Sequence, residues 1–145
     1  MRACLGLDYG LRRIGLPASD PDTGLAFALG THVEGRDGSI LTHLEKLITE
    51  RAVTTLVVGL PLTADGGEGD IAARVRKFAT RLEEEFGLAV VLWDERYSSA
   101  EADRWLDGAR RPAKEDRDAV AAQIILQSYL DSLAAGESEP GDGPC

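Results

Sequence analysis

The chain has 145 residues, of which 43% are hydrophobic, and carries 25 Asp and Glu against 16 Lys and Arg, a formal net charge of −9. This length and composition predict one soluble domain, and the charge excludes a globally basic surface for nucleic acid. Apolar runs such as LVVGL are far shorter than the ~20 residues of a membrane span. With no export leader and only two cysteines, which form no framework, we expect a cytoplasmic protein that does not bind membranes.

The first third of the chain predicts three short strands. Apolar runs at residues 3–8, 14–19 and 25–33 are joined by turn-rich segments, which favours an antiparallel meander. Pro17 lies within the second run and cannot donate a ladder hydrogen bond, so we expect the strand either to be bulged or to leave an edge N–H position there.

The remainder of the chain alternates between helical and strand patterns. Helical spacing begins at Ile40 and continues to about Ala52, and a buried strand follows over 54–60. A helix over 67–87 ends at Gly87 and precedes a strand at 88–93. Its expected inner stripe consists of Ile71, Val75, Phe78, Leu82 and Phe86. A short helix from Ser98 to Gly108, a loop over 109–116 and a last helix over 118–133 complete the expected order.

These elements predict the fold class. Two apolar strands that each follow an amphipathic helix call for parallel pairing, so the class is α/β with a mixed five-stranded sheet flanked by helices. We expect one domain over residues 1–135 and a disordered acidic tail over 136–145.

Three acidic residues lie at positions where exposure to solvent alone does not explain a charged side chain. Asp8 closes the first strand, Glu95 follows the strand that ends at Trp93, and Asp118 begins the last helix. At about 100° per residue Asp118 shares a helix face with apolar residues, so it is expected to point inward. Carboxyl ends of parallel strands meet at one edge of a sheet, where the first two acids could converge.

A cluster of carboxylates without His or Cys suits hard divalent ions. Mg²⁺ or Mn²⁺ would offset the repulsion among the acids, and two ions about 4 Å apart could activate a water for phosphodiester hydrolysis. Taken singly, each acid has a structural alternative. Asp8 could cap the YGLRR turn or pair with Arg12 or Arg13. Glu95 could pair with Arg96 or Lys114, and Asp118 is a good N-cap.

Four motifs in order carry a resemblance to a known family. They are GLDYGLRRIG, VVGLPLTADG, DERYSSAEA and DAVAAQIILQSYLD. The chain resembles the YqgF/RuvX family, relatives of the RuvC resolvase in the ribonuclease H-like superfamily, over residues 3–133. The resemblance implies a ribonuclease H-like fold and a metal-dependent nuclease that matures the 5′ end of pre-16S ribosomal RNA. By motif, its catalytic and metal-binding acids are Asp8, Glu95 and Asp118.

Substrate contacts are expected from residues close to those acids. Arg13, Arg96 and Lys114 could hold scissile or flanking phosphates, or pair with the acids themselves, and the hydroxyl of Ser98 lies in the same motif. His32 and His43 have no metal-ligand spacing and are expected at the surface.

Competing functions remain open at this point. The same site could resolve a four-way DNA junction, which requires two active sites and therefore more than a strict monomer. A phosphate-binding ATPase lobe and a non-catalytic RNA-binding factor are further alternatives. RNA is the favoured substrate, and a monomer or weak homodimer is expected.

Overall fold

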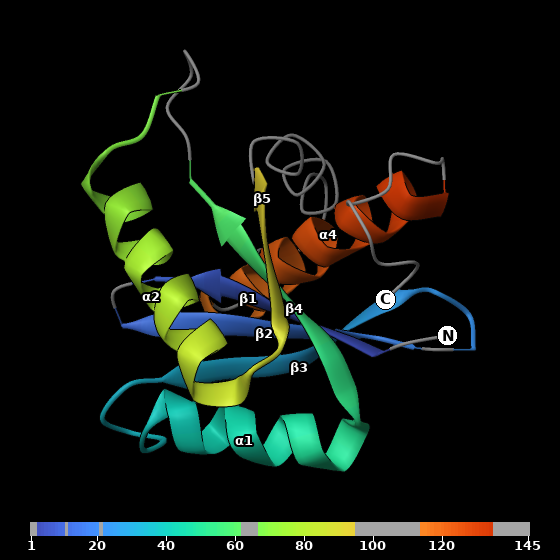
Figure 1. The fold of residues 1–145 in the computed structure, drawn as a ribbon, viewed down its shortest axis with the longest axis horizontal. Coiled ribbons are helices and arrows are strands. Elements are labelled where there is room, and N and C mark those ends of the chain that lie inside the picture. The colour runs from blue at the N-terminus through green and yellow to red at the C-terminus, as the bar shows by residue number, and fades with distance from the viewer. Residues whose placement is uncertain (1–2, 11, 21, 62–66, 95–113, 135–145) are drawn as a thin grey trace.

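The structure is a computed structural model that describes residues 3–10, 12–20, 22–61, 67–94 and 114–134. Strands β1 (Ala3–Tyr9), β2 (Arg13–Ser19) and β3 (Ala26–Val33) form the antiparallel meander expected from the sequence. A register shift between Gly15 and Pro17 confirms the predicted bulge in β2. Figure 1 shows how the strands and helices are arranged.

The second half of the sheet is parallel. Strand β4 (Val53–Leu60) pairs with β1, and β5 (Ala89–Asp94) pairs with β4, so the order is β3-β2-β1-β4-β5. This confirms the predicted mixed five-stranded sheet. Three strands that run in the same direction, β1, β4 and β5, therefore bring their carboxyl ends to one edge.

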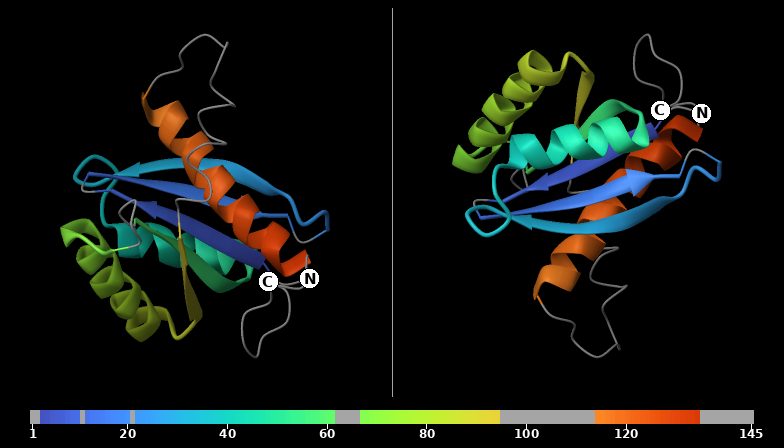
Figure 2. Two further views of the ribbon diagram at one scale, coloured as in Figure 1. Left: turned by 90° about the horizontal axis from the view of Figure 1, so that it is seen from above. Right: turned by 90° about the horizontal axis from the view of Figure 1, so that it is seen from below.

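Helices cover both faces of the sheet. Helices α1 (Ile40–Arg51) and α2 (Asp70–Phe86) lie on one face, and α4 (Lys114–Ala134) crosses β1, β2 and β3 on the other (Figure 2). Helix α2 ends at Gly87, whose φ of 66° is the left-handed conformation that glycine adopts at low cost. None of the helices in the described ranges is long and apolar enough to cross a bilayer.

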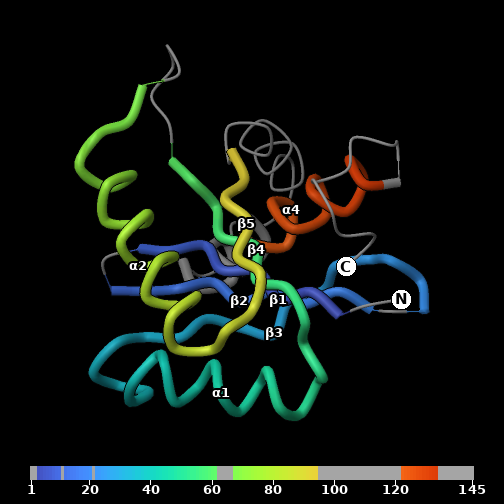
Figure 3. The backbone as a smooth tube through the Cα atoms, in the orientation of Figure 1, coloured from blue at the N-terminus to red at the C-terminus, as the bar shows by residue number. Residues whose placement is uncertain are grey.

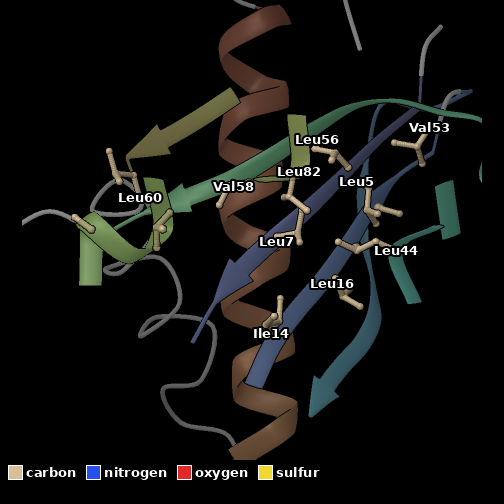
Figure 4. Packing of buried hydrophobic residues seen from close by; sticks show 13 residues of the cluster. Leu5, Leu7, Ile14, Leu16, Leu44, Val53, Leu56, Val58, Leu60 and Leu82 are labelled. Carbon is tan, nitrogen blue, oxygen red and sulfur yellow. The ribbon is translucent and has the colours of Figure 1, made fainter. Parts of the chain in front are cut away.

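The larger hydrophobic core lies between the sheet and the α1/α2 layer. Leu5 and Leu7 of β1, Ile14 and Leu16 of β2, and Leu44 of α1 are almost completely buried in it (Figure 4). A smaller cluster on the α4 side joins Cys4 and Val57 of the sheet to Leu126, Tyr129 and Leu130 of α4. Strand β1 contributes to both clusters. It runs between β2 and β4 (Figure 3).

Two helix expectations are wrong. Helix α4 begins at Lys114, within the expected loop, because polar residues such as those at 114–116 suit a first helical turn as well as a loop. Ile71, expected in the inner stripe of α2, is 38% exposed, since the buried stripe begins with Ala72 and Val75.

The cysteines also differ from expectation. Cys4 is 1% exposed in β1 and forms a disulfide, whereas the two cysteines were expected to form no framework. The expected helix at 98–108 and the tail over 136–145 lie outside the described residues.

Candidate active site

Asp8 lies near the carboxyl end of β1 and faces α4. Side chains alternate along a strand, and Leu5 and Leu7 enter the larger core, so Cys4, Gly6 and Asp8 face the other side. An added Cβ on Gly6 would lie 3.4 Å from the Cβ of Leu126 in α4, which fixes the direction. Asp8 is half-buried, and its backbone is level with Gly15 of β2.

The parallel strands end at the same edge as β1. Leu60, the last residue of β4, pairs with Asp94, the last residue of β5. Nothing in the sequence singled out Asp94, although it is a half-buried carboxylate at this edge. Its neighbour Trp93 packs edge-on against Tyr129 of α4, with ring centroids 5.4 Å apart. Asp94 therefore points to the α1/α2 side, opposite to Asp8.

Helix α4 presents the predicted apolar face to the sheet. Ala122, Ile125 and Tyr129 are all buried, as expected for positions that share a face with Asp118. Asp118 itself occupies the second turn of α4, so the alternative that it caps the helix is wrong. The structure describes the backbone of Asp118 within α4, whereas its side chain lies outside the described part of the chain.

Arg13 begins β2 on the same face as Asp8. Ile14 points into the larger core, so Arg13 and Gly15 point toward the α4 side. Arg13 is half-buried, and its Nε is a buried donor with no hydrogen-bond partner in the part of the chain that the structure describes. The turn before it is tight, because the N–H of Gly10 donates to the carbonyl of Arg13 at 2.9 Å. A buried guanidinium nitrogen without a partner is suited to an anionic ligand.

The remaining predicted site residues fall outside this description. Glu95, Arg96 and Ser98 are not among the described residues, and of Lys114 only the backbone is described, as the first residue of α4. Within the described ranges no group of three His, Cys, Asp or Glu side chains could hold a metal ion. Of the three predicted metal ligands, Asp8 is the one whose side chain the structure describes.

The expectation that both histidines lie at the surface is wrong. His32 of β3 is fully buried, and its Nδ1 lies 2.9 Å from Nδ1 of His43 in α1. Nε2 of His32 lies 3.2 Å from the carbonyl oxygen of Gly38, which can only accept, so this nitrogen is the donor. Nε2 also lies 3.1 Å from a carboxylate oxygen of Glu34. The two rings contact each other, with centroids 5.1 Å apart, and no sequence spacing reveals such a pair.

The histidine pair has an electrostatic consequence. Burial lowers the pKa of His43 below its ordinary value of 6.5, and the nearby His32 and Lys46 lower it further, against the opposing effect of Asp37. His43 also lines an open pocket with Asp37, Ser39, Thr42 and Lys46. The pair sits on the α1 side of the sheet, on the face opposite to Asp8.

Comparison with known proteins identifies relatives over nearly the whole chain. The model of a family described as "RuvX: Holliday junction resolvase" matches residues 2–132. A Nitrosospira multiformis protein named "Putative pre-16S rRNA nuclease" is 42% identical over 134 residues, which cover 90% of this chain and 89% of that protein. A Synechocystis protein of the same name is 39% identical over 143 residues, with 97% and 94% covered.

Solved structures share the fold. Thermus thermophilus RuvC in complex with a Holliday junction substrate superposes with a TM-score of 0.60 at 13% identity, covering 96% of this chain and 99% of that chain. The fowlpox virus resolvase bound to its Holliday junction gives a TM-score of 0.56 at 9% identity, with 90% and 98% covered. At this identity the likeness concerns the fold, and it confirms the ribonuclease H-like class.

Proposed function

Because the chain belongs to the RuvX family, we propose that it is a divalent-metal-dependent nuclease that cleaves RNA and matures the 5′ end of pre-16S ribosomal RNA. The observation that carries the proposal is the position of Asp8. This acid lies half-buried near the carboxyl end of the central strand β1, on the face that α4 crosses. Relatives named as pre-16S rRNA nucleases support the choice of substrate.

The donor chemistry fits Mg²⁺ or Mn²⁺. Carboxylate oxygens are the ligands that these hard ions prefer, and Asp8, Glu95 and Asp118 would hold them, with two ions as the proposed number. A bound ion would activate a water and stabilise the leaving oxygen of the phosphodiester. The sequence supports Glu95, because it directly follows Asp94, the last residue of β5.

Arg13 is proposed to hold a substrate phosphate. Its Nε is buried without a described partner on the same face as Asp8, and a guanidinium donates to phosphate in a fixed fork. Arg96, Ser98 and Lys114 are proposed as further phosphate contacts, supported by their place beside the acids in the sequence. Local cations of this kind are needed because the chain as a whole carries a charge of −9.

Four-way DNA junctions are the second candidate substrate. The likeness in fold to the RuvC complex favours it, and symmetric cleavage of a junction would require a homodimer. The RNA nuclease is proposed to act as a monomer or weak homodimer in the cytoplasm.

The deciding experiment compares two acids at one edge of the sheet. Asp8→Asn keeps the size of the side chain and removes the charge that would bind the ion, so cleavage of labelled RNA should fall at least about a thousandfold. Asp94→Asn changes a carboxylate that points to the opposite face and should retain cleavage. Each protein is incubated with single-stranded RNA and with a four-way junction, in Mg²⁺, Mn²⁺ or EDTA.

The outcomes separate the candidates. Cleavage of RNA that needs both metal and Asp8 supports the proposal, and preferential cleavage of the junction favours the resolvase. Cleavage that survives Asp8→Asn, or that is lost equally in Asp94→Asn, contradicts the assignment of the site. Binding of RNA without cleavage by the wild type would instead indicate a non-catalytic RNA-binding factor.

A further inference from the structure

Helix α2 carries its basic and acidic residues in different turns. The acids lie at its two ends, with Asp70 in the first turn and glutamates at positions 83–85 in the last. The basic residues all lie in the two turns between them, at Arg74, Arg76, Lys77 and Arg81. The middle of α2 is therefore locally positive, in a chain whose net charge is −9.

One of these four basic side chains is held by an acid. Arg76 donates from Nε and Nη2 to the two carboxylate oxygens of Glu68, each at 2.6 Å. The other three, Arg74, Lys77 and Arg81, are exposed, and no hydrogen bond or ion pair joins their side chains to any residue that the structure describes. We call these three residues the α2 stripe.

Helical geometry sets the α2 stripe on one side of the helix. At about 100° per residue, Arg74, Lys77 and Arg81 lie within about 60° of one another, whereas Arg76 lies at least about 100° from each of them. Seven residues at about 1.5 Å per residue separate the ends of the stripe by about 10 Å. The stripe is thus a short row of cations that faces solvent.

The α2 stripe lies beside the carboxyl end of β1. The ring of Phe78 in α2 contacts the ring of Tyr9, with centroids 4.9 Å apart, and Tyr9 directly follows Asp8. Phe78 is four residues after Arg74 and three before Arg81, so the three side chains are neighbours on the helix surface. Figure 1 agrees with this placement, because α2 begins on the side of the molecule toward which β4 and β5 point.

We propose that the α2 stripe binds phosphates of the RNA beyond the cleaved bond. Exposed lysine and arginine contact phosphates without reading the bases, and over about 10 Å a nucleic-acid strand presents more than one phosphate. An RNA strand that passes Asp8 reaches the stripe round the end of β1. The inference deepens the proposed function, on which it rests, by adding the surface that holds the substrate outside the catalytic site.

The test removes the charges of the stripe and keeps the helix. Glutamine is a good helix former, so Arg74→Gln, Lys77→Gln and Arg81→Gln are made singly and together. Binding of a long single-stranded RNA is measured in EDTA by fluorescence anisotropy over a range of salt concentrations. The slope of log affinity against log salt should fall by about 0.7 in each single variant and by about 2 in the triple variant. At physiological salt the triple variant should bind at least about tenfold more weakly.

Arg76→Gln is the matched control. It removes the same charge from the same helix, but Glu68 already occupies this guanidinium, so the affinity and the salt slope should stay close to those of the wild type. All four positions are exposed, so melting temperatures should remain within about 4 °C of the wild type. The loss of kcat/KM in the triple variant should be larger on a long RNA than on a tetranucleotide that spans only the cleaved bond.

Each outcome decides the proposal. A triple variant with the salt slope of the wild type and an affinity within twofold of it would show that no RNA lies on the stripe. An equal loss of affinity in Arg76→Gln would show that the charge of the whole helix acts, and an equal loss of kcat/KM on both RNA lengths would assign the cations to the catalytic site. Either result would overturn the proposal, and the single variants carry the same test should the triple variant fail to fold.

The wild type separates this inference from the proposed function. Binding of RNA without cleavage would refute the nuclease alone, because the affinities in EDTA would still test the stripe. A wild type that does not bind RNA would refute both.

Discussion

The two faces of the sheet differ in the side chains that they carry. The α1/α2 face is covered by aliphatic side chains, including Leu5, Leu7 and Leu56, each at most 1% exposed. The α4 face carries Cys4, Gly6 and Asp8 on the same strand, and a smaller apolar cluster. Strand β1 thus alternates between leucines of the larger core and the small or charged residues of the α4 face. The core leucines and Asp8, the proposed metal ligand, therefore occupy alternate positions of one strand.

The largest effect on stability is expected from Leu7→Ala. Leu7 is 1% exposed in the larger core, and its truncation leaves a cavity, so the free energy of unfolding should fall by about 2–5 kcal/mol. Urea denaturation followed by circular dichroism measures the change. Cleavage per folded molecule should be unchanged, because the side chain points away from Asp8.

A substitution of the next residue, Asp8, tests the opposite face of the same strand. Asp8→Asn should leave the denaturation midpoint equal to or above that of the wild type while abolishing cleavage. A comparable loss of activity in folded Leu7→Ala protein would show that the two faces are not independent.

An intermediate effect on the free energy of unfolding is expected from His32 and His43, a pair of polar side chains within the α1/α2 layer. The pKa of His43 is lowered in the folded protein, so below its ordinary value of 6.5 the unfolded chain binds more protons than the folded chain. The contribution of His43 to stability is therefore complete above that pH and decreases as the pH falls.

This prediction is measured as a difference between two proteins. Urea denaturation of the wild type and of His43→Gln at about pH 7.5 and about pH 5.5 isolates the histidine from acids that titrate lower. The wild type should lose more stability between these pH values than the variant. Equal losses would indicate that the pair does not affect stability in this range.

The smallest effect is expected from Ile71→Gln on α2. Ile71 is 38% exposed, so its replacement should change the free energy of unfolding by no more than about 0.5 kcal/mol. Val75→Ala on the same helix removes two methyl groups from a fully buried side chain and should cost clearly more. A large loss in Ile71→Gln would place this residue in the core after all.

Much of this architecture can be read from hydrophobic periodicity. Short apolar runs with turns between them specified β1, β2 and β3, and the helix of period 3.6 before each of β4 and β5 specified parallel pairing. Hydrophobic periodicity does not locate the ends of helices and strands accurately. Helix α4 begins four residues before Asp118 because Lys114, Glu115 and Asp116 are polar, and polar residues suit a first helical turn as well as a loop.

Individual site residues are harder to predict than elements. Asp8 stood out because a charge within an apolar strand needs an explanation, and the inward face of α4 follows from its period. His32 and His43 gave no signal, because their contact joins β3 to α1 and depends on tertiary packing.

Hydrogen bonds join helix α4 to strand β3, which comes much earlier in the sequence. Gln127 accepts the N–H of Ala26 at 2.7 Å, and Gln123 donates to the carbonyl of the same residue at 3.2 Å, about a hundred positions away in sequence. During synthesis the amino-terminal end emerges first, so the α1/α2 layer can assemble while the other face of the sheet still lacks its helix. The surface around Asp8 is therefore completed only when translation of the domain has almost ended.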